Sequence, residues 1–277
     1  MPGRLEGQVA FVTGAARGQG RSHAVRLAEE GADIIAVDIC AQVDTVPFPM
    51  ATPADLAETV GQVEAIGRRI VVAEADVRDY GALSKAVDDG VAELGRLDIV
   101  AANAGIVSFG LLHELSEETW RDQIDTNLIG VWHTAKAAIP HVIAGGRGGS
   151  IVLTGSVAGL KGVPGIGHYV AAKHGLTGLM KAMAVELAPH RIRVNSVNPT
   201  QVDTPMLRNE ASFRLFAPDK ADPTIEDVRP VSQAMNLLPI PWVEAVDLSN
   251  AIVFLSSPEG RYITGLAMTV DAGSLIK

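Results

Sequence analysis

The sequence predicts a single α/β domain over residues 1–277, with a doubly wound parallel sheet and helices on both faces. Short apolar runs alternate along the chain with longer segments of helical pattern, and this alternation favours parallel strands joined by right-handed crossovers. A glycine turn or a polar residue follows each apolar run, which is where such sheets bind their ligands. The 277 residues, of which 47% are hydrophobic, suffice for one large core.

The first predicted unit is a strand at residues 9–12, a glycine turn at 13–20 and a helix that extends to Glu30. Glycines in such a turn let the backbone approach a pyrophosphate, and the helix amino terminus offers it unpaired N–H groups. The turn therefore predicts a dinucleotide site of the Rossmann type, with an ordinary glycine-rich turn as the alternative. The predicted cofactor-binding residues are Gly14, Arg17, Gly18, Gln19 and Gly20.

The second predicted strand, residues 33–37, ends at Asp38, which lies 18 residues beyond Gly20. An acidic residue about 20 residues beyond the glycines typically binds an adenosine ribose. The carboxylate of Asp38 would repel a 2′-phosphate, so Asp38 and the adjacent Ile39 predict NAD as the cofactor. Arg17 is a weaker sign of the opposite preference, because a basic residue there can contact that phosphate.

Three further strands are predicted at residues 69–74, 97–101 and 149–154, with helices at 80–94 and 117–143. Each run is apolar on both faces, as buried parallel strands are. The residues that follow these strands are Asp76 and Val77, then Asn103, Ala104 and Gly105, and finally Ser156. Since the carboxyl ends of parallel strands share one edge of the sheet, these polar residues and Asp38 are predicted to converge on one crevice.

A candidate catalytic pair, Tyr169 and Lys173, stands four residues apart, so on a helix both side chains project from one face. A phenol is a poor base because its pKa is about 10, but a nearby ammonium favours the phenolate. The pair therefore predicts a proton-transfer site, with a solvated pair on a helix surface as the alternative. His168 projects about 100° away from Tyr169, which predicts a bystander or part of the pocket wall.

Taken together, these motifs resemble the short-chain dehydrogenase/reductase family over essentially the whole chain. The serine-to-tyrosine interval of 13 residues is typical of that family. Further matching motifs are Thr126-Asn127-Leu128, Asn198-Pro199 and Val270-Asp271-Ala272-Gly273.

The resemblance implies a role for each catalytic residue. Tyr169 would be the general acid/base, and Ser156 would polarise the substrate oxygen. Lys173 would lower the pKa of Tyr169 and hold the ribose, while Asn127 would anchor a water in a proton relay. Cofactor contacts are also implied for Tyr169, Lys173, Pro199, the backbone of Val202 and the hydroxyl of Thr204.

The residue types suit those roles. Removal of hydride from a secondary alcohol requires the hydroxyl proton to leave as well, so a base must lie within about 3 Å of that oxygen. Tyr169 and Ser156 can bracket it. From the residues alone, Ser156 could instead cap the loop after its strand, and Asn127 could bond to backbone inside a helix.

An insertion at residues 41–53 follows the second strand and contains three prolines together with Phe48 and Met50. It is longer than the usual connection of 2 to 6 residues and starts where the adenosine should lie. With the glycine turn, it resembles a mycofactocin-linked subgroup that includes carveol dehydrogenases, in which NAD is held tightly and reoxidised by an auxiliary redox carrier. The alternative is a tolerated surface loop.

A second departure spans residues 205–242, where a helical segment through Met206 and Leu207 is followed by many prolines and apolar residues. In the family this position forms the substrate lid, and its apolar side chains predict an apolar substrate. Thr200 replaces the glycine usual after Asn-Pro, so the local backbone is predicted to differ from the family pattern.

Composition excludes several other classes. The net charge of −9 disfavours nucleic acid or an anionic membrane as a partner. The one cysteine, Cys40, cannot form an internal disulfide, and no clustered His and Cys residues have metal-ligand spacing. The chain shows neither an apolar leader at residues 1–6 nor a run long enough to span a bilayer, so a cytoplasmic location without metal is predicted.

The sequence thus predicts an oxidoreductase that transfers hydride between NAD and a small hydrophobic secondary alcohol or ketone, with a carveol-like cyclic terpenoid as the candidate substrate. Rival functions are a non-catalytic NAD-binding module, a steroid or 3-oxoacyl-type carbonyl reductase, an epimerase and an enoyl reductase. The helices at 117–143 and after Tyr169 are apolar on more than one side, which predicts a homotetramer formed through them.

Overall fold

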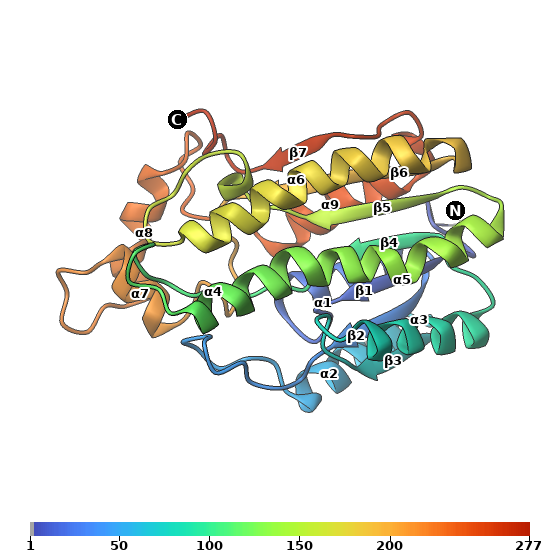
Figure 1. Cartoon of the computed structure of the whole chain (residues 1–277), viewed down its shortest axis with the longest axis horizontal. Coiled ribbons are helices and arrows are strands. Elements are labelled where there is room, and N and C mark those ends of the chain that lie inside the picture. Colours follow the sequence, from blue (N-terminus) through green and yellow to red (C-terminus); the bar gives the residue numbers. More distant parts are fainter. Residues whose placement is uncertain (1–2) are drawn as a thin grey trace.

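A seven-stranded parallel sheet forms the centre of the computed structural model, which describes residues 3–277 (Figure 1). The strands are β1 (Val9–Thr13), β2 (Asp33–Asp38), β3 (Ile70–Glu74), β4 (Ile99–Ala102), β5 (Gly149–Thr154), β6 (Ile192–Pro199) and β7 (Ala267–Val270). Their order is β3-β2-β1-β4-β5-β6-β7, and every pairing is parallel. The chain therefore reverses its direction of travel across the sheet between β1 and β4, which confirms the predicted doubly wound fold.

Helices cover both faces of the sheet (Figure 1). They are α1 (Gly18–Glu29), α2 (Pro53–Ala65), α3 (Tyr80–Leu94), α4 (Glu117–Ile124), α5 (Gly130–Gly145), α6 (Gly167–Leu187), α7 (Glu210–Phe216), α8 (Ile225–Ala234) and α9 (Ala245–Ser256). Helices α1, α2 and α9 pack on one face, and α3, α5 and α6 on the other. Along β1, Phe11 faces one core while Ala10 and Val12 face the other, because successive side chains of a strand alternate.

The sheet edges differ from the prediction of strands buried on both sides. In β3, which lies at one edge, Val72 is 43% exposed, and all four residues of β7 at the other edge are only partly buried. The sequence motifs did not identify β6 or β7 as strands, since only their final residues carry recognisable motifs. Edge strands have one neighbour each, so their side chains are less completely covered.

The helix predicted at 117–143 is interrupted. A π-helical turn, η1 (Asp125–Ile129), separates α4 from α5 and contains Asn127. Such turns insert one residue into the helical repeat and occur frequently at functional sites.

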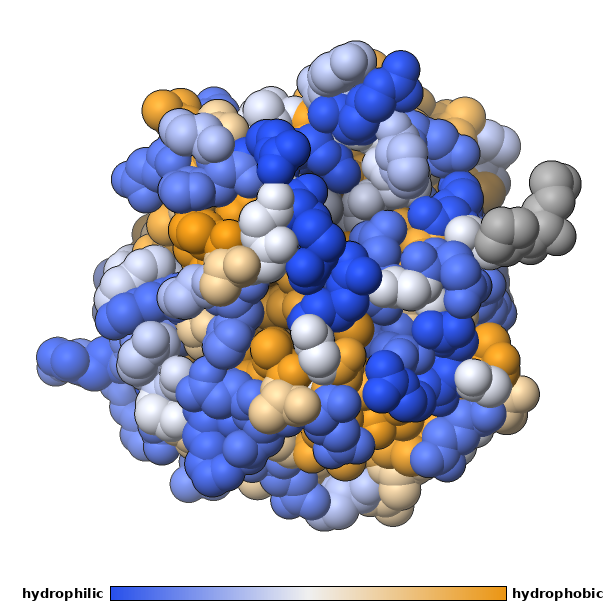
Figure 2. Space-filling view, turned by 90° about the vertical axis from the view of Figure 1, so that its right-hand side faces the viewer, coloured by the Kyte–Doolittle hydropathy of each residue, from blue (hydrophilic) through white to orange (hydrophobic). Residues whose placement is uncertain are grey.

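The two ends of the molecule differ in character. The carboxyl ends of the strands, the insertion after β2 and helices α7 and α8 gather at the left of Figure 1. Figure 2 shows the opposite end, where hydrophilic residues predominate. Within residues 3–277, no helix is long and apolar enough to cross a membrane. The sequence-based expectation of no leader rests partly on Met1 and Pro2, which lie outside the described residues.

Candidate active site

A cleft lies beyond the carboxyl ends of β1, β2, β3 and β4. Most of the predicted cofactor residues line it, namely Gly14, Arg17, Gly18, Gln19, Gly20, Asp38, Ile39, Asp76, Val77, Asn103, Ala104, Gly105 and Thr204. Tyr169, Lys173, Pro199 and Val202 are not part of this lining. The convergence predicted from four strand ends is therefore present for three of them, and Ser156 lies outside this part of the cleft.

The glycine turn joins β1 to α1 with little space to spare. Gly14 and Gly18 have φ values of +66° and +57°, a conformation that L side chains rarely adopt. A Cβ atom on Gly20 would lie 1.8 Å from the carbonyl oxygen of Gly14. The first turn of α1 therefore packs directly against the glycine turn, and its residues Gly18, Gln19 and Gly20 line the cleft. A helix amino terminus in this position is suited to bind a dinucleotide phosphate.

Two buried polar atoms in the cleft lining have no hydrogen-bond partner among residues 3–277. They are Oε1 of Gln19 and Oγ1 of Thr126. Buried polar groups are normally paired, so both atoms fit a polar ligand in this cleft. With the glycine cradle, they are compatible with a bound dinucleotide.

Asp38 lies at the end of β2 and organises the turn beside it. Its Oδ2 accepts a hydrogen bond from the N–H of Ala16 at 3.0 Å, and its Oδ1 accepts one from the N–H of Cys40 at 3.1 Å. The side chain is 8% exposed and lines the cleft. Asp38 thus holds the glycine turn and the start of the insertion in place while its negative charge faces the site.

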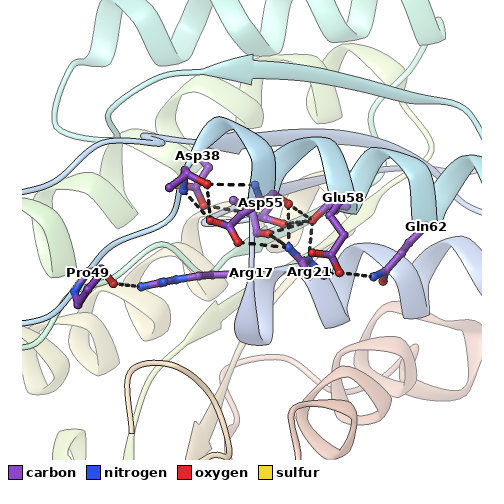
Figure 3. A network of polar contacts seen from close by, with 11 residues as sticks. Arg17, Arg21, Asp38, Pro49, Asp55, Glu58 and Gln62 are labelled. Atoms are coloured by element: carbon purple, nitrogen blue, oxygen red, sulfur yellow. Dashed lines mark hydrogen bonds and ion pairs between the residues drawn. The ribbon is translucent and has the colours of Figure 1, made fainter. Parts of the chain in front are cut away.

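Arg17 and Arg21 have different partners (Figure 3). Arg17 donates from Nη2 to the carbonyl of Pro49 at 2.6 Å, and so connects the glycine turn with the insertion. Arg21 donates to the carbonyls of Ala16 and Asp55, which ties the turn to α2. Because its guanidinium is engaged by Pro49, Arg17 offers weaker support for a 2′-phosphate than the sequence suggested.

The insertion itself is packed rather than loosely exposed. Val43, Val46 and Phe48 are buried and form an apolar cluster with Ile106 and Val107, the residues that follow the β4 motif. The hydroxyl of Thr45 donates to Asp122 of α4 at 2.7 Å. Phe48 and Met50 also line the cleft, as a cover over a bound dinucleotide would.

Arg78 is a cleft residue that sequence reasoning missed. Its guanidinium binds the carboxylate of Asp76 at 2.7 Å and that of Asp122 at 2.7 Å. Asp76 therefore faces the cleft as part of an ion-pair network that reaches α4. The signal in the sequence was a basic residue two positions after an acidic one at a strand end, a pattern that is too common to be recognised by itself.

Asn103 links the glycine turn to the β4 motif. Its Nδ2 donates to the carbonyl of Thr13 at 3.1 Å, and the Thr13 hydroxyl accepts from the N–H groups of Asn103 and Ala104. Thr154 at the end of β5 donates to Oδ1 of Asn103 at 3.2 Å. These bonds fix three adjacent strand ends relative to one another.

Ser156, Tyr169 and Lys173 come together at the end of β5 and the start of α6. The hydroxyl of Ser156 accepts from the N–H of Ala158 at 3.1 Å, so it caps its loop as well as reaching Tyr169. The ammonium of Lys173 lies 5.5 Å from the centre of the Tyr169 ring and donates to the carbonyl of Thr154 at 2.7 Å. The predicted catalytic pair is therefore on one helix face, with Lys173 buried and Tyr169 partly buried, rather than a solvated surface pair.

The protonation of this group is dominated by burial. Burial raises the pKa of the Tyr169 phenol, and the hydrogen bond with Ser156 acts in the opposite direction. Burial also lowers the pKa of Lys173 to about 8, so the ammonium keeps most of its charge at pH 7. The direction for Tyr169 is opposite to the expected one, because desolvation outweighs the nearby ammonium, which is engaged by Thr154.

Asn127 is fully buried in η1, where its side chain binds both backbone groups of Ile106. Its Oδ1 accepts from the Ile106 N–H at 2.9 Å, and its Nδ2 donates to the Ile106 carbonyl at 2.8 Å. The backbone bonding considered from sequence is thus observed.

The segment after β6 takes a backbone path without a glycine. Thr200 adopts no left-handed conformation, and its hydroxyl donates to Oδ1 of Asn236 at 3.3 Å. Val202 forms a parallel bridge with Val243, and the Thr204 hydroxyl donates to the Val202 carbonyl at 3.4 Å. Pro199 ends β6 beneath this segment.

Residues 205–242 contain helices that the sequence motifs did not predict. Met206 and Leu207 lie in a turn rather than a helix, and α7 and α8 follow with Asn209 and Thr224 as their amino-terminal caps. The capping box of Thr224 and Asp227 was the available signal, but Pro230 inside α8 obscured it. Among residues 3–277, no cluster of acidic, His or Cys side chains is arranged to hold a metal ion.

Comparison with known proteins places this arrangement in a family. Residues 8–214 match the short chain dehydrogenase family. The (−)-trans-carveol dehydrogenase of Rhodococcus erythropolis is 59% identical over 275 residues, which cover 99% of each chain.

Two solved structures are similar throughout. Carveol dehydrogenase from Mycobacterium avium in complex with NAD is 60% identical, with a TM-score of 0.98 over 99% of this chain and 100% of that one. A short chain dehydrogenase from Mycobacterium paratuberculosis bound to NAD is 48% identical, with a TM-score of 0.91 over 99% of this chain and 100% of that one. The family match over residues 8–214 and the similarity over the full length of these relatives show that the chain is a member of the short-chain dehydrogenase family.

Proposed function

We propose that this chain catalyses the NAD-dependent oxidation of a small, apolar, cyclic secondary alcohol, of the carveol type, to its ketone. The observation that carries the proposal is the group formed by the buried Ser156 and Lys173 with the partly buried Tyr169, beside a cleft cradled by glycines and bounded by Asp38. A protein that only binds NAD does not need this group. The similarity to carveol dehydrogenases over the full chain supports the substrate class.

The proposed chemistry assigns one role to each side chain. NAD, when bound, accepts the hydride from the carbinol carbon. Tyr169, as its phenolate, takes the hydroxyl proton and becomes a neutral phenol, and Ser156 holds the same oxygen by a hydrogen bond. The positive charge of Lys173 stabilises the phenolate that forms in the buried site, and Asn127 fixes the backbone along which a water can carry the proton away.

The substrate class can be tested by product analysis. The purified enzyme should convert (−)-trans-carveol to carvone, detected by gas chromatography and mass spectrometry. A hydroxysteroid, a 3-hydroxyacyl thioester and a linear alcohol serve as competing substrates. A kcat/KM higher for any of these than for cyclic terpenoid alcohols would contradict the proposed substrate and favour the corresponding reductase function.

Cofactor selectivity is proposed to depend on the charge of Asp38. Asp38→Asn should lower the ratio of kcat/KM for NAD over NADP by at least about tenfold, because the repulsion of a 2′-phosphate is removed. Asp38→Asn also loosens the glycine turn, but this lowers the affinity for NAD and NADP alike. The ratio of the two kcat/KM values therefore reports the effect of the charge alone. An unchanged ratio would show that another residue determines the preference.

We also propose that the insertion covers the adenosine side of the cleft and slows cofactor release. Three contacts support this cover: the bond from Arg17 to Pro49, the bond from Thr45 to Asp122, and the packing of Phe48 on Ile106. If about 100 Å² of apolar cofactor surface is buried, the contribution is about 2.5 kcal/mol, or nearly two decades in dissociation rate.

The purified protein should then carry NAD or NADH through gel filtration. A variant in which residues 41–51 are replaced by a short Gly-Ser link should lose it, and Thr52 is kept because it caps α2. A wild-type enzyme that retains its NAD would be reoxidised by an auxiliary redox carrier of the mycofactocin type. Its turnover should therefore continue with an artificial electron acceptor and no added NAD. Wild-type protein that is empty and exchanges NAD within milliseconds would contradict the cover.

A homotetramer is proposed from the outer surfaces of α5 and α6. Trp132 is 40% exposed and borders a shallow depression with Ile139, Leu179 and Met183, an apolar surface of the kind that subunits cover. Light scattering at micromolar concentration should give four times the 29.0 kDa chain mass. A monomeric mass would contradict this assembly. The buried, unpaired Cys40 supports a cytoplasmic location for it.

A further inference from the structure

A chain of buried polar side chains connects α4, the segment after β4 and α6. Nε2 of His168 lies 2.7 Å from Oγ of Ser108. Oε1 of Gln123 accepts from the Ser108 N–H at 3.3 Å and lies 3.5 Å from the Ser108 hydroxyl. The exposed fractions of Gln123, Ser108 and His168 are 0%, 4% and 0%, so solvent does not replace any of these bonds.

This series of polar side chains ends at Ile106, whose backbone also binds the side chain of Asn127. Nε2 of Gln123 donates to the Ile106 carbonyl at 2.8 Å, and Nδ2 of Asn127 donates to that carbonyl at the same distance. Ile106 packs in one apolar cluster with Tyr169. The series of hydrogen bonds therefore runs from His168, the residue next to Tyr169, to Ile106, the residue that Asn127 also binds.

The partners orient the hydrogen bonds in one direction. Oε1 of Gln123 only accepts, so the Ser108 hydroxyl donates to it and accepts from the Nε2–H of His168. Nδ1 of His168 is buried without a partner in residues 3–277, which suits the unprotonated nitrogen of a neutral ring better than an N–H. The Trp120 indole lies beside the imidazole, with ring centres 6.5 Å apart and planes 26° apart.

A histidine at position 168 is not required for packing, because an apolar residue would fill the same space without leaving a buried nitrogen unpaired. The imidazole instead makes its one bond to the segment that also contacts Tyr169 and Asn127. Small displacements of a catalytic group are costly, since a shift of about 1 Å can reduce a rate about 100-fold.

We propose that His168 is a positioning residue, which through Ser108 and Gln123 sets the placement of Tyr169 relative to the Ile106 backbone held by Asn127. It touches none of the reacting atoms. This inference goes further than the prediction of a bystander, and its kinetic consequence rests on the proposed dehydrogenase function.

The test compares His168→Leu, His168→Gln and Ser108→Ala, with His190→Leu on an exposed turn as the control. His168→Leu should lower kcat by about 10-fold to 100-fold and raise the isotope effect measured with alcohol deuterated at the carbinol carbon, while bound NAD is retained. His168→Gln should recover most of the rate because its amide N–H can reach Ser108. Combining His168→Leu with Ser108→Ala should add little, because both remove the same bond.

A second measurement does not require turnover. The chain has three tyrosines, so 13C labelling at the ring carbon that bears the hydroxyl gives three resonances, and the one absent from Tyr169→Phe is assigned. His168→Leu and Ser108→Ala should shift that resonance, and His168→Gln should restore it. An unmoved resonance, or additive kinetic losses, would overturn the positioning role. Inactivity of the wild type on every alcohol would instead count against the proposed function.

Discussion

Tyr169→Phe is expected to lower kcat/KM for alcohol oxidation by about 10² to 10⁴-fold, because it removes the group that takes the hydroxyl proton. The aromatic ring remains, so its packing with Ile106 should persist. Since Tyr169 is absent from the lining of the dinucleotide cleft, NAD content should match that of the wild type.

This result is checked by steady-state kinetics together with the NAD content and melting temperature of the same preparation. Tyr262→Phe is the matched control, because that tyrosine is 89% exposed. A Tyr169→Phe enzyme that retains the wild-type rate would show that another group is the base. Loss of both activity and NAD would mean that the phenol supports the cleft rather than the chemistry.

Gly20→Ala is expected to weaken NAD binding. Its Cβ would lie 1.8 Å from the Gly14 carbonyl oxygen and 2.8 Å from Nδ2 of Asn103. The first contact is with backbone, so α1 must move away from the glycine turn that forms the cradle. Overpacking of this kind lowers the free energy of unfolding by about 1 to 3 kcal/mol. An equal loss of binding free energy would lower the affinity for NAD by about 5-fold to 150-fold.

Gly61→Ala in α2 separates this contact from a general effect of losing a helical glycine. A Cβ there meets nothing within 4 Å, so the substitution should raise the free energy of unfolding by about 0.5 to 1 kcal/mol. Thermal unfolding and the NAD content of the purified proteins measure both outcomes. If Gly20→Ala has the wild-type melting temperature and NAD content, α1 is not fixed against the turn as described.

Much of the fold could be predicted because its signals are local. The strand, glycine turn and helix from residue 9 to Glu29 are encoded by adjacent residues, and α3 begins and ends where the apolar period does. Parallel strand order follows from the alternation of elements, and it brings Asp38, Asp76 and Asn103 to one edge of the sheet. The family, which comparison confirms, depends on intervals along the chain such as the one from Ser156 to Tyr169.

Contacts between distant segments had no such signal. Ser108 and His168 are 60 residues apart, and Thr45 and Asp122 are 77 apart. Neither pair has a periodic pattern, since one member of each lies in an irregular segment. The break in the helix at η1 and the engagement of Lys173 by Thr154 likewise depend on neighbours contributed by other elements.

The doubly wound sheet, the dinucleotide cleft and the candidate group of Ser156, Tyr169 and Lys173 could be predicted from the sequence, because their signals are residue types and intervals along the chain. Only the tertiary structure decided that the insertion packs on Ile106, that Arg17 binds it, and that His168 is bonded to the catalytic neighbourhood. The physical reason is that periodicity specifies which face of an element is buried, whereas hydrogen bonds and close packing between irregular segments depend on distances that form only when the elements dock.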